Sequence, residues 1–132
     1  MTQNKTEIQN AHDKAVLCVQ QVMENKAQDP VLLDVSGFSS FADYFVICSG
    51  KSSRQVQGMA DHLERRLREY GIKPLGVEGA REGHWVLMDY GEVIIHIFYE
   101  PVRQFYDLES LWSGAKRVPV ESKYVMPNAK FL

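Results

Sequence analysis

Apolar positions change their spacing along the chain, and the changes predict alternating helices and strands. Residues 6–26 carry apolar side chains at helical spacing, from Ile8 to Met23, which predicts an amphipathic first helix. Asp29-Pro30 ends this helix, and short apolar runs at 31–35 and 44–49 predict two strands. The second run is apolar almost throughout, which is typical of a central strand covered on both faces.

Two further helices follow the same reasoning. Ser52 and Gln55 fit a capping box that begins a second helix, which Gly71 ends. Pro101 suits the first turn of a third helix. The apolar stripe expected on this third helix consists of Val102, Phe105, Leu108, Leu111 and Trp112.

Between these two helices, residues 74–100 predict a short strand, a polar loop and a hairpin of two longer strands. Gly91 can adopt the positive φ that a tight hairpin turn requires. The pleat then divides the hairpin into two faces. One face is purely apolar and must belong to the core: Val86, Met88, Val93, Ile95 and Ile97. The other face is mixed, and is either covered by another element or kept for a partner: Trp85, Leu87, Asp89, Ile94, His96 and Phe98.

This order of elements predicts an α/β fold with a mixed sheet of about five strands flanked by helices. We expect the strand before the second helix and a strand after it to pair in parallel through a crossover, with the antiparallel hairpin at one side. Residues 1–113 are expected to form a single domain. Residues 114–132 contain two prolines and four basic residues against one acid, and are expected to be a flexible extension or an arm.

Composition narrows the class of function. The chain of 132 residues has a formal net charge of -2, so it lacks the positive field needed to hold a nucleic-acid backbone, and little direct nucleic-acid contact is expected. Cys18 and Cys48 lie in apolar runs without metal-ligand spacing, as reduced core thiols do. No run approaches the roughly 18 apolar residues of a membrane span. We therefore expect a soluble, intracellular protein without a cofactor or metal.

The junction Gly50-Lys51-Ser52 superficially resembles a phosphate-binding loop between a strand and a helix. A Walker motif needs glycine five residues before Gly50, but that position is Phe45, within a strand. A helix cap is therefore the favoured interpretation. A nucleotide-binding or nucleotidyltransferase-like enzyme that uses this junction stays the alternative.

Other candidate chemistry is weaker still. Four acids lie near strand ends, but no two of them alternate on one strand as a metal pair would, so solvated acids are favoured: Asp34, Asp43, Glu78 and Asp89. No serine or cysteine lies at a spacing from His84 or His96 that would identify a nucleophile with its general base. No catalytic residue is assigned.

Trp85 is the most informative single residue. A large aromatic side chain in a strand is often simply part of the core. Trp85, however, follows the polar loop 81–84, which places it at a rim where tryptophan commonly anchors a protein partner. We favour the binding role.

Three ordered motifs of this chain resemble the ribosomal silencing factor family, also called Iojap-like. They are DVSGFSSFADYFVICSGKSSRQVQGMADHLE, then PLGVEG, then GHWVLMDYGEVIIHIFYEPVRQFYDLESLW. The resemblance runs from the first helix to Trp112. It implies a nucleotidyltransferase-like fold without its catalytic acids, and therefore no enzyme.

The resemblance also implies a partner. Such a protein binds the large ribosomal subunit through ribosomal protein fourteen, blocks joining of the small subunit and represses translation in the cytoplasm, and it forms a homodimer off the ribosome. We place Trp85, Leu87, Met88 and Asp89 at or beside the protein interface. Further candidates are Tyr99, Tyr106, Leu111 and Trp112.

Overall fold

The computed structural model describes residues 10–120. Its helices are α2 (Ala11–Glu24), α3 (Ser53–Glu69), α4 (Glu100–Tyr106) and α5 (Leu108–Leu111). Its strands are β1 (Gln28–Asp34), β2 (Tyr44–Gly50), β3 (Gly76–Glu78), β4 (Trp85–Asp89), β5 (Val93–Tyr99) and β6 (Lys116–Val118). No helix within these residues has the length and apolar character needed to cross a membrane.

The strands form one six-stranded sheet in the order β3-β4-β5-β2-β1-β6. β2 and β5 are parallel, and the neighbouring pairs are antiparallel, so the predicted mixed α/β sheet is confirmed. The strand beyond the expected five is β6, which pairs with β1 between Leu32↔Val118 and Asp34↔Lys116. This part of the expected C-terminal extension therefore belongs to the sheet, while residues 121–132 lie outside the described part of the chain.

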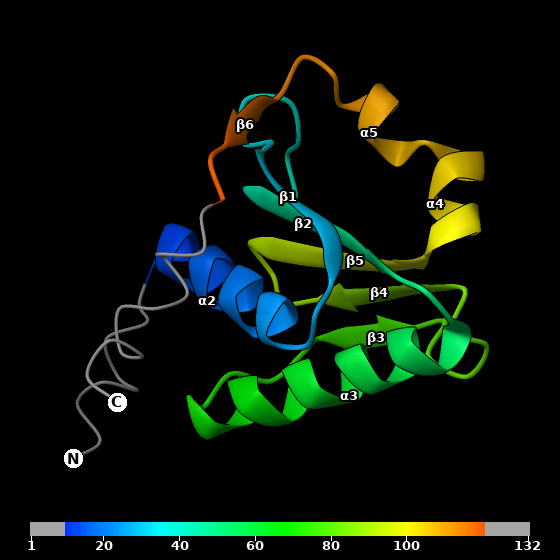
Figure 1. Ribbon diagram of the computed structural model, residues 1–132. Coiled ribbons are helices and arrows are strands. Elements are labelled where there is room, and N and C mark those ends of the chain that lie inside the picture. Colours follow the sequence, from blue (N-terminus) through cyan, green and yellow to red (C-terminus); the bar gives the residue numbers. More distant parts are fainter. Residues whose placement is uncertain (1–9, 121–132) are drawn as a thin grey trace.

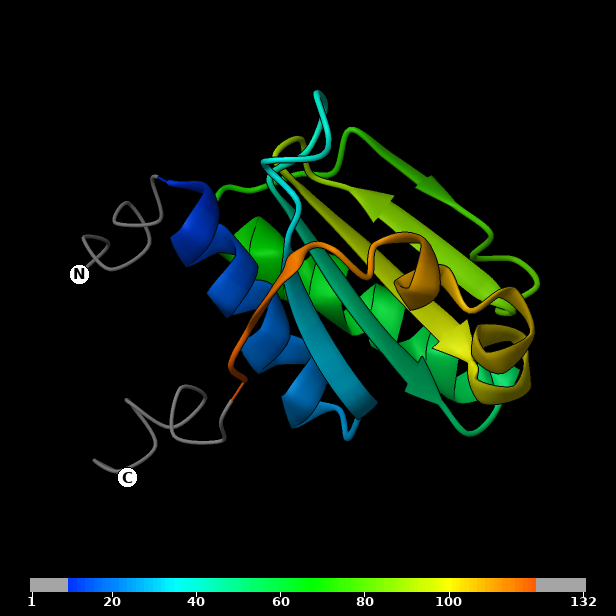
Figure 2. The same ribbon diagram turned by 90° about the horizontal axis from the view of Figure 1, so that it is seen from above.

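The two faces of the sheet are covered unequally. Figures 1 and 2 show α2 and α3 side by side along one face, while the short helices α4 and α5 and the segment leading to β6 cross the other. The helix-covered face holds the larger core, which includes Val46, Met88 and Ile95, all fully buried. The opposite face holds a smaller core around Phe45, Ile47 and Phe98. This second face is where covering is incomplete.

The hairpin has the predicted division into two faces. β4 and β5 pair with Trp85 opposite Phe98 and Leu87 opposite His96, so the mixed set of side chains lies on the less covered face. Gly91 has a φ of 87° and supplies the turn, where its N–H donates to Asp89 Oδ1 at 2.8 Å. The alternation of side chains along each strand was therefore enough to predict which residues share a face of the hairpin.

The expected third helix is wrong in one respect, because it is interrupted. Asp107 adopts a left-handed conformation with φ 49° and ψ 51°, and separates α4 from α5. The interruption changes the helical phase, so the predicted apolar stripe does not face the core as a whole. Phe105 is 80% exposed and Leu111 77% exposed. Arg103 is buried in their place.

Candidate functional site

The incompletely covered side of the sheet carries a cluster of apolar side chains that we call the aromatic face. It consists of Trp85, Leu87, Phe105, Tyr106, Leu111 and Trp112. Trp85 and Leu87 project from β4, and the other four come from the segment of α4 and α5. Large apolar groups gathered on one exposed surface are typical of a protein-interaction site.

Trp85 connects the elements beneath this face. Its ring lies 4.8 Å from the ring of Phe98 on β5 and 5.0 Å from that of Tyr106 on α4. Its indole Nε1–H donates to Nδ1 of His96 at 3.1 Å. The indole is half-buried and its polar atom is satisfied from below, which fixes how the ring is presented to solvent.

His96 is the polar centre under the aromatic face. It is 5% exposed, and the ring of Phe45 meets it edge-on with centroids 5.0 Å apart. Burial lowers the pKa of His96 from 6.5 to about 4. Because Nδ1 accepts from Trp85, the neutral ring carries its proton on Nε2, and Nε2 has no hydrogen-bond partner among residues 10–120.

A groove lies between α4 and the loop of residues 79–84, with Trp85 in its lining. Its volume is about 460 Å³. The lining residues are Gly79, Glu82, His84, Trp85, Pro101, Val102, Phe105 and Tyr106. Gly79 has a φ of +84°, and any Cβ there would collide with the carbonyl oxygen of Trp85, so glycine is required where this loop turns against β4.

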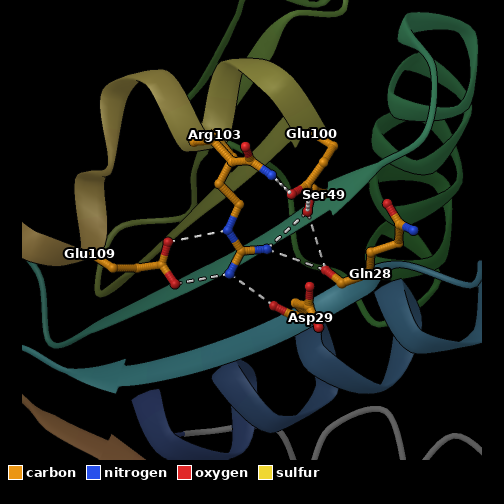
Figure 3. A network of polar contacts seen from close by, with 7 residues as sticks. Gln28, Asp29, Ser49, Glu100, Arg103 and Glu109 are labelled. Atoms are coloured by element: carbon orange, nitrogen blue, oxygen red, sulfur yellow. Dashed lines mark hydrogen bonds and ion pairs between the residues drawn. The ribbon is translucent and has the colours of Figure 1, made fainter.

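Arg103 fastens α4 and α5 to the sheet. Its guanidinium donates to both carboxylate oxygens of Glu109, Nε to Oε1 at 3.1 Å and Nη2 to Oε2 at 2.9 Å. On the other side it donates to Ser49 Oγ at 2.9 Å and to the carbonyls of Gln28 and Asp29 at 3.3 and 2.9 Å. Figure 3 shows the side chain reaching from α4 between Glu109 and the strands.

These contacts explain why a charge is tolerated inside the fold. Arginine has five N–H donors, and each of the five is matched here by an acceptor. Ser49 in turn donates to Glu100 Oε1 at 2.7 Å, which adds a second tie between β2 and α4. The hydrogen bonds from Ser49 and Gln104 lower the pKa of Glu100. The aromatic face therefore rests on a polar frame.

The junction before α3 is a helix cap. Ser52 Oγ accepts from the N–H of Gln55 at 3.0 Å, and Gln55 Oε1 accepts from the N–H of Lys51 at 2.7 Å. The second bond reaches Lys51 and not Ser52, one residue earlier than in the standard capping box. These backbone donors are already used by the protein's own side chains, which leaves the nucleotide-binding alternative without support here.

The carboxylates and thiols of residues 10–120 form no metal-binding cluster. Asp34 accepts from the Ser36 side chain and N–H, and these bonds lower its pKa. Within residues 10–120, no three His, Cys, Asp or Glu side chains lie together as a metal site would need. Cys18 and Cys48 are free and buried, and burial raises the pKa of each thiol to about 12, so both stay protonated.

The structure brings together some of the predicted interface residues and separates others. Trp85, Leu87, Tyr106, Leu111 and Trp112 share the aromatic face. Met88 does not: it is fully buried on the opposite face, under the helices, because alternate residues of a strand point to opposite sides.

Of two more predicted residues, Tyr99 lies on the helix-covered side, whereas Asp89 is on the same side of the sheet as Trp85 and Leu87 but at the other end of β4. Tyr99 is half-buried and packs against the core on the helix-covered side, which it shares with Met88. Asp89 is half-buried at the end of β4, where it accepts from Gly91. Of the eight residues predicted for the interface, Met88 is the one that no partner can touch in this fold.

The sequence interpretation missed several exposed aromatic residues. Phe105 was assigned to a core-facing stripe, but α4 turns Arg103 towards the sheet and leaves Phe105 exposed. Phe38 and Phe41, 61% and 64% exposed, lie in the loop between β1 and β2. Aromatic residues within a serine-rich loop were the available signal, since such a loop lies at the surface.

Comparison with known proteins places this fold in a family. The sequence model of the family described as "Ribosomal silencing factor during starvation" matches residues 8–130, which is most of the chain. The chain belongs to the ribosomal silencing factor family. The description of the family is that of a regulator. The resemblance predicted from the sequence is confirmed.

Individual relatives agree with the assignment. Ribosomal silencing factor RsfS of Halalkalibacterium halodurans is 41% identical over 105 residues, which are 80% of this chain and 90% of the relative. RsfS of Chromobacterium violaceum is 36% identical over 100 residues, 76% of this chain and 82% of the relative. A mouse protein called "Mitochondrial assembly of ribosomal large subunit protein 1" is 28% identical over 100 residues, 74% of this chain and 44% of its own length.

Solved structures of this family share the fold. A crystal structure of a Chromobacterium violaceum protein superimposes with a TM-score of 0.78 at 33% identity, over 85% of this chain and 92% of that one. A crystal structure from Bacillus halodurans gives 0.74 at 37% identity, over 83% of this chain and 99% of that one. The fold of this chain is therefore shared with two solved structures of 33% and 37% identity.

Loss of the carboxylate that pairs with Arg103 should destabilise the fold. We expect Glu109→Gln to lower the free energy of unfolding by about 2 kcal/mol, because it leaves a buried guanidinium without its counter-charge. Glu64→Gln is the matched control, since Glu64 pairs with Arg68 on the exposed surface of α3 at 2.7 Å. We expect the control to change stability by less than about 1 kcal/mol. Urea unfolding measures both, and equal losses would contradict the assigned role.

Acid should destabilise the fold through His96. The pKa of His96 is about 4 in the folded state, against 6.5 for an unburied histidine. Between these pH values the unfolded chain binds more protons than the folded one, so the free energy of unfolding falls as the pH drops from 6.5 to 4. His96→Asn removes this titration and keeps an acceptor for Trp85. We expect urea unfolding to show a wild-type stability that decreases more steeply with acidification than that of the variant. Parallel curves from pH 7 to pH 4.5 would refute it.

Proposed function

We propose that this protein keeps ribosomal subunits apart by binding the large subunit through ribosomal protein fourteen. In this position its bulk blocks joining of the small subunit and represses translation in the cytoplasm. The observation that carries the proposal is the aromatic face, because it offers a partner a surface of exposed apolar side chains. Membership of the ribosomal silencing factor family supports it independently.

Blocking of this kind requires affinity and bulk but no chemistry. A complex with a dissociation constant of tens of nanomolar corresponds to about -10 kcal/mol. A few well-placed aromatic and aliphatic anchors commonly supply most of such an energy. Phe105, Tyr106 and Leu111 are the most exposed anchors available on the aromatic face.

Charge favours a basic protein as the partner. The chain has a formal net charge of -2, and acidic side chains border the aromatic face at Glu82 and Asp107. Opposite charge on the partner accelerates encounter and helps to orient it. A small basic ribosomal protein fits both the apolar anchors and the acidic border.

Off the ribosome, we propose that the chain forms a homodimer. Exposed apolar side chains such as Phe105 and Leu111 are unfavourable in water, and pairing with a second copy would cover them. Sedimentation equilibrium of the purified chain measures this directly. A monomer at micromolar concentration would remove the dimer from the proposal without affecting the ribosomal role.

The proposed function makes a direct prediction about ribosomal subunits. We expect the purified protein to co-sediment with isolated large subunits but not with small ones, and to reduce formation of joined ribosomes when both are mixed. Sucrose-gradient profiles with and without the protein measure this. Absence of binding would sink the proposal, and binding without a loss of joined ribosomes would remove its blocking step.

Two leucines allow the binding surface to be tested with a matched pair of variants. Leu111 on the aromatic face and Leu75 before β3 are each 77% exposed, so replacing either alters the fold equally little. We expect Leu111→Asp to weaken large-subunit binding by about tenfold, because an anchor is lost and a charge must be desolvated. Leu75→Asp should bind as the wild type does. If both variants bind equally well, the aromatic face around α5 is not the interface.

A further inference from the structure

We propose that the groove between α4 and the 79–84 loop binds an arginine side chain of the protein partner. This inference deepens the proposed function and rests on it for the source of the arginine, which is the basic ribosomal protein. It assigns a chemical specificity to one part of the aromatic face. Four properties of the groove support arginine binding: its aromatic lining, its unpaired acid, its size and its rigidity.

Aromatic rings meet at an angle in this groove. Trp85 and Tyr106 have ring centroids 5.0 Å apart and an interplanar angle of 49°, and Phe105 stands edge-on to Tyr106 at 5.1 Å and 88°. Ring faces carry partial negative charge and attract cations, and tryptophan does so most strongly. Phe105 is 80% exposed and Tyr106 53%, so these rings are available to a partner.

Glu82 gives the groove its charge. It is the only acidic residue of the lining, and no lysine or arginine lines the groove. Within residues 10–120, the Glu82 carboxylate makes no ion pair or hydrogen bond, including with its neighbour Arg81. An exposed acid beside π faces favours a cation and disfavours phosphate or carboxylate ligands.

The walls of the groove are held in place before any partner arrives. Gln57 of α3 donates to the carbonyls of Ala80 and Arg81 at 3.1 and 2.6 Å, which ties the 79–84 loop to the helix. The N–H of Tyr99 donates to the carbonyl of His84 at 2.9 Å and closes the other end of the loop. The opposite wall, α4, is held by Arg103. A preformed site loses little ordering entropy when it binds.

Among cations, arginine matches the groove best. Its guanidinium is planar, so it can stack on a ring while its N–H fork reaches a carboxylate, whereas the lysine ammonium is a compact and strongly hydrated charge. The volume of about 460 Å³ accommodates one long side chain and its aliphatic stem. An aliphatic side chain would fill the same space but would leave Glu82 without a partner.

The direct test uses the full chain labelled with ¹⁵N and blocked Gly-Arg-Gly, Gly-Lys-Gly and Gly-citrulline-Gly peptides. The chain has two tryptophans, so comparison with Trp85→Phe assigns the Trp85 indole signal. We expect the arginine peptide to shift this signal saturably, the lysine peptide to bind about threefold more weakly, and the neutral citrulline peptide at least about tenfold more weakly. Equal binding of citrulline and arginine, or no saturable shift with arginine, would overturn the proposal.

Matched variants test the role of the acid. We expect Glu82→Gln to weaken binding of the arginine peptide by about fivefold, and Glu24→Gln, which removes the same charge from the exposed surface of α2, to leave it unchanged. An unchanged Glu82→Gln would remove the acid from the site and overturn the assigned specificity. Thermal unfolding of both variants checks that each remains folded.

Co-sedimentation separates this inference from the proposed function. If the wild type binds large subunits and Glu82→Gln binds them equally well, the groove proposal fails and the ribosomal role stands. If the arginine peptide binds but the wild type does not bind large subunits, the groove is a cation site and the ribosomal role fails. We expect wild-type binding and a weakening of about threefold or more for Glu82→Gln.

Discussion

The less covered half of this molecule depends on one buried charge. Arg103 arises from a helix of seven residues, too short to be stable alone, and its guanidinium joins that helix, the next one and two strands. On the same face of the sheet, the rings of Phe45 and Trp112 meet edge-on with centroids 4.9 Å apart. The hydrogen bonds of Arg103 fix the orientation of α4 and α5 as well as their position, because hydrogen bonds weaken steeply when their angle is distorted. The exposed rings are thus held at defined angles above a sheet.

Affinity and stability place opposite demands on the aromatic face. Burying Phe105, Tyr106 and Leu111 would stabilise the isolated domain, yet it would leave nothing for a partner to contact. The fold meets both demands, because the helix-covered face of the sheet has a complete core and the other face has a smaller core that is only partly covered. Membership of the ribosomal silencing factor family agrees with a regulatory role.

Sequence patterns predicted the parts of this fold that depend on local rules. The hairpin faces followed from the two-residue period of a strand, and the cap of α3 followed from Ser52 and Gln55. Local rules did not place an interruption at Asp107, whose left-handed conformation ends α4 while its N–H donates to the carbonyl of Arg103. They also could not show the groove, whose walls come from residues 79–85 and 101–106 and meet only in three dimensions.

The pairing of β6 with β1 has a consequence for how the chain is made. Asp34 lies opposite Lys116, so the edge of β1 stays open until nearly the whole domain has been synthesised and has left the ribosomal tunnel. An open strand edge can pair with other chains. The nascent protein therefore keeps this edge open to other chains until β6 emerges, and a truncation before Lys116 would make that transient condition permanent.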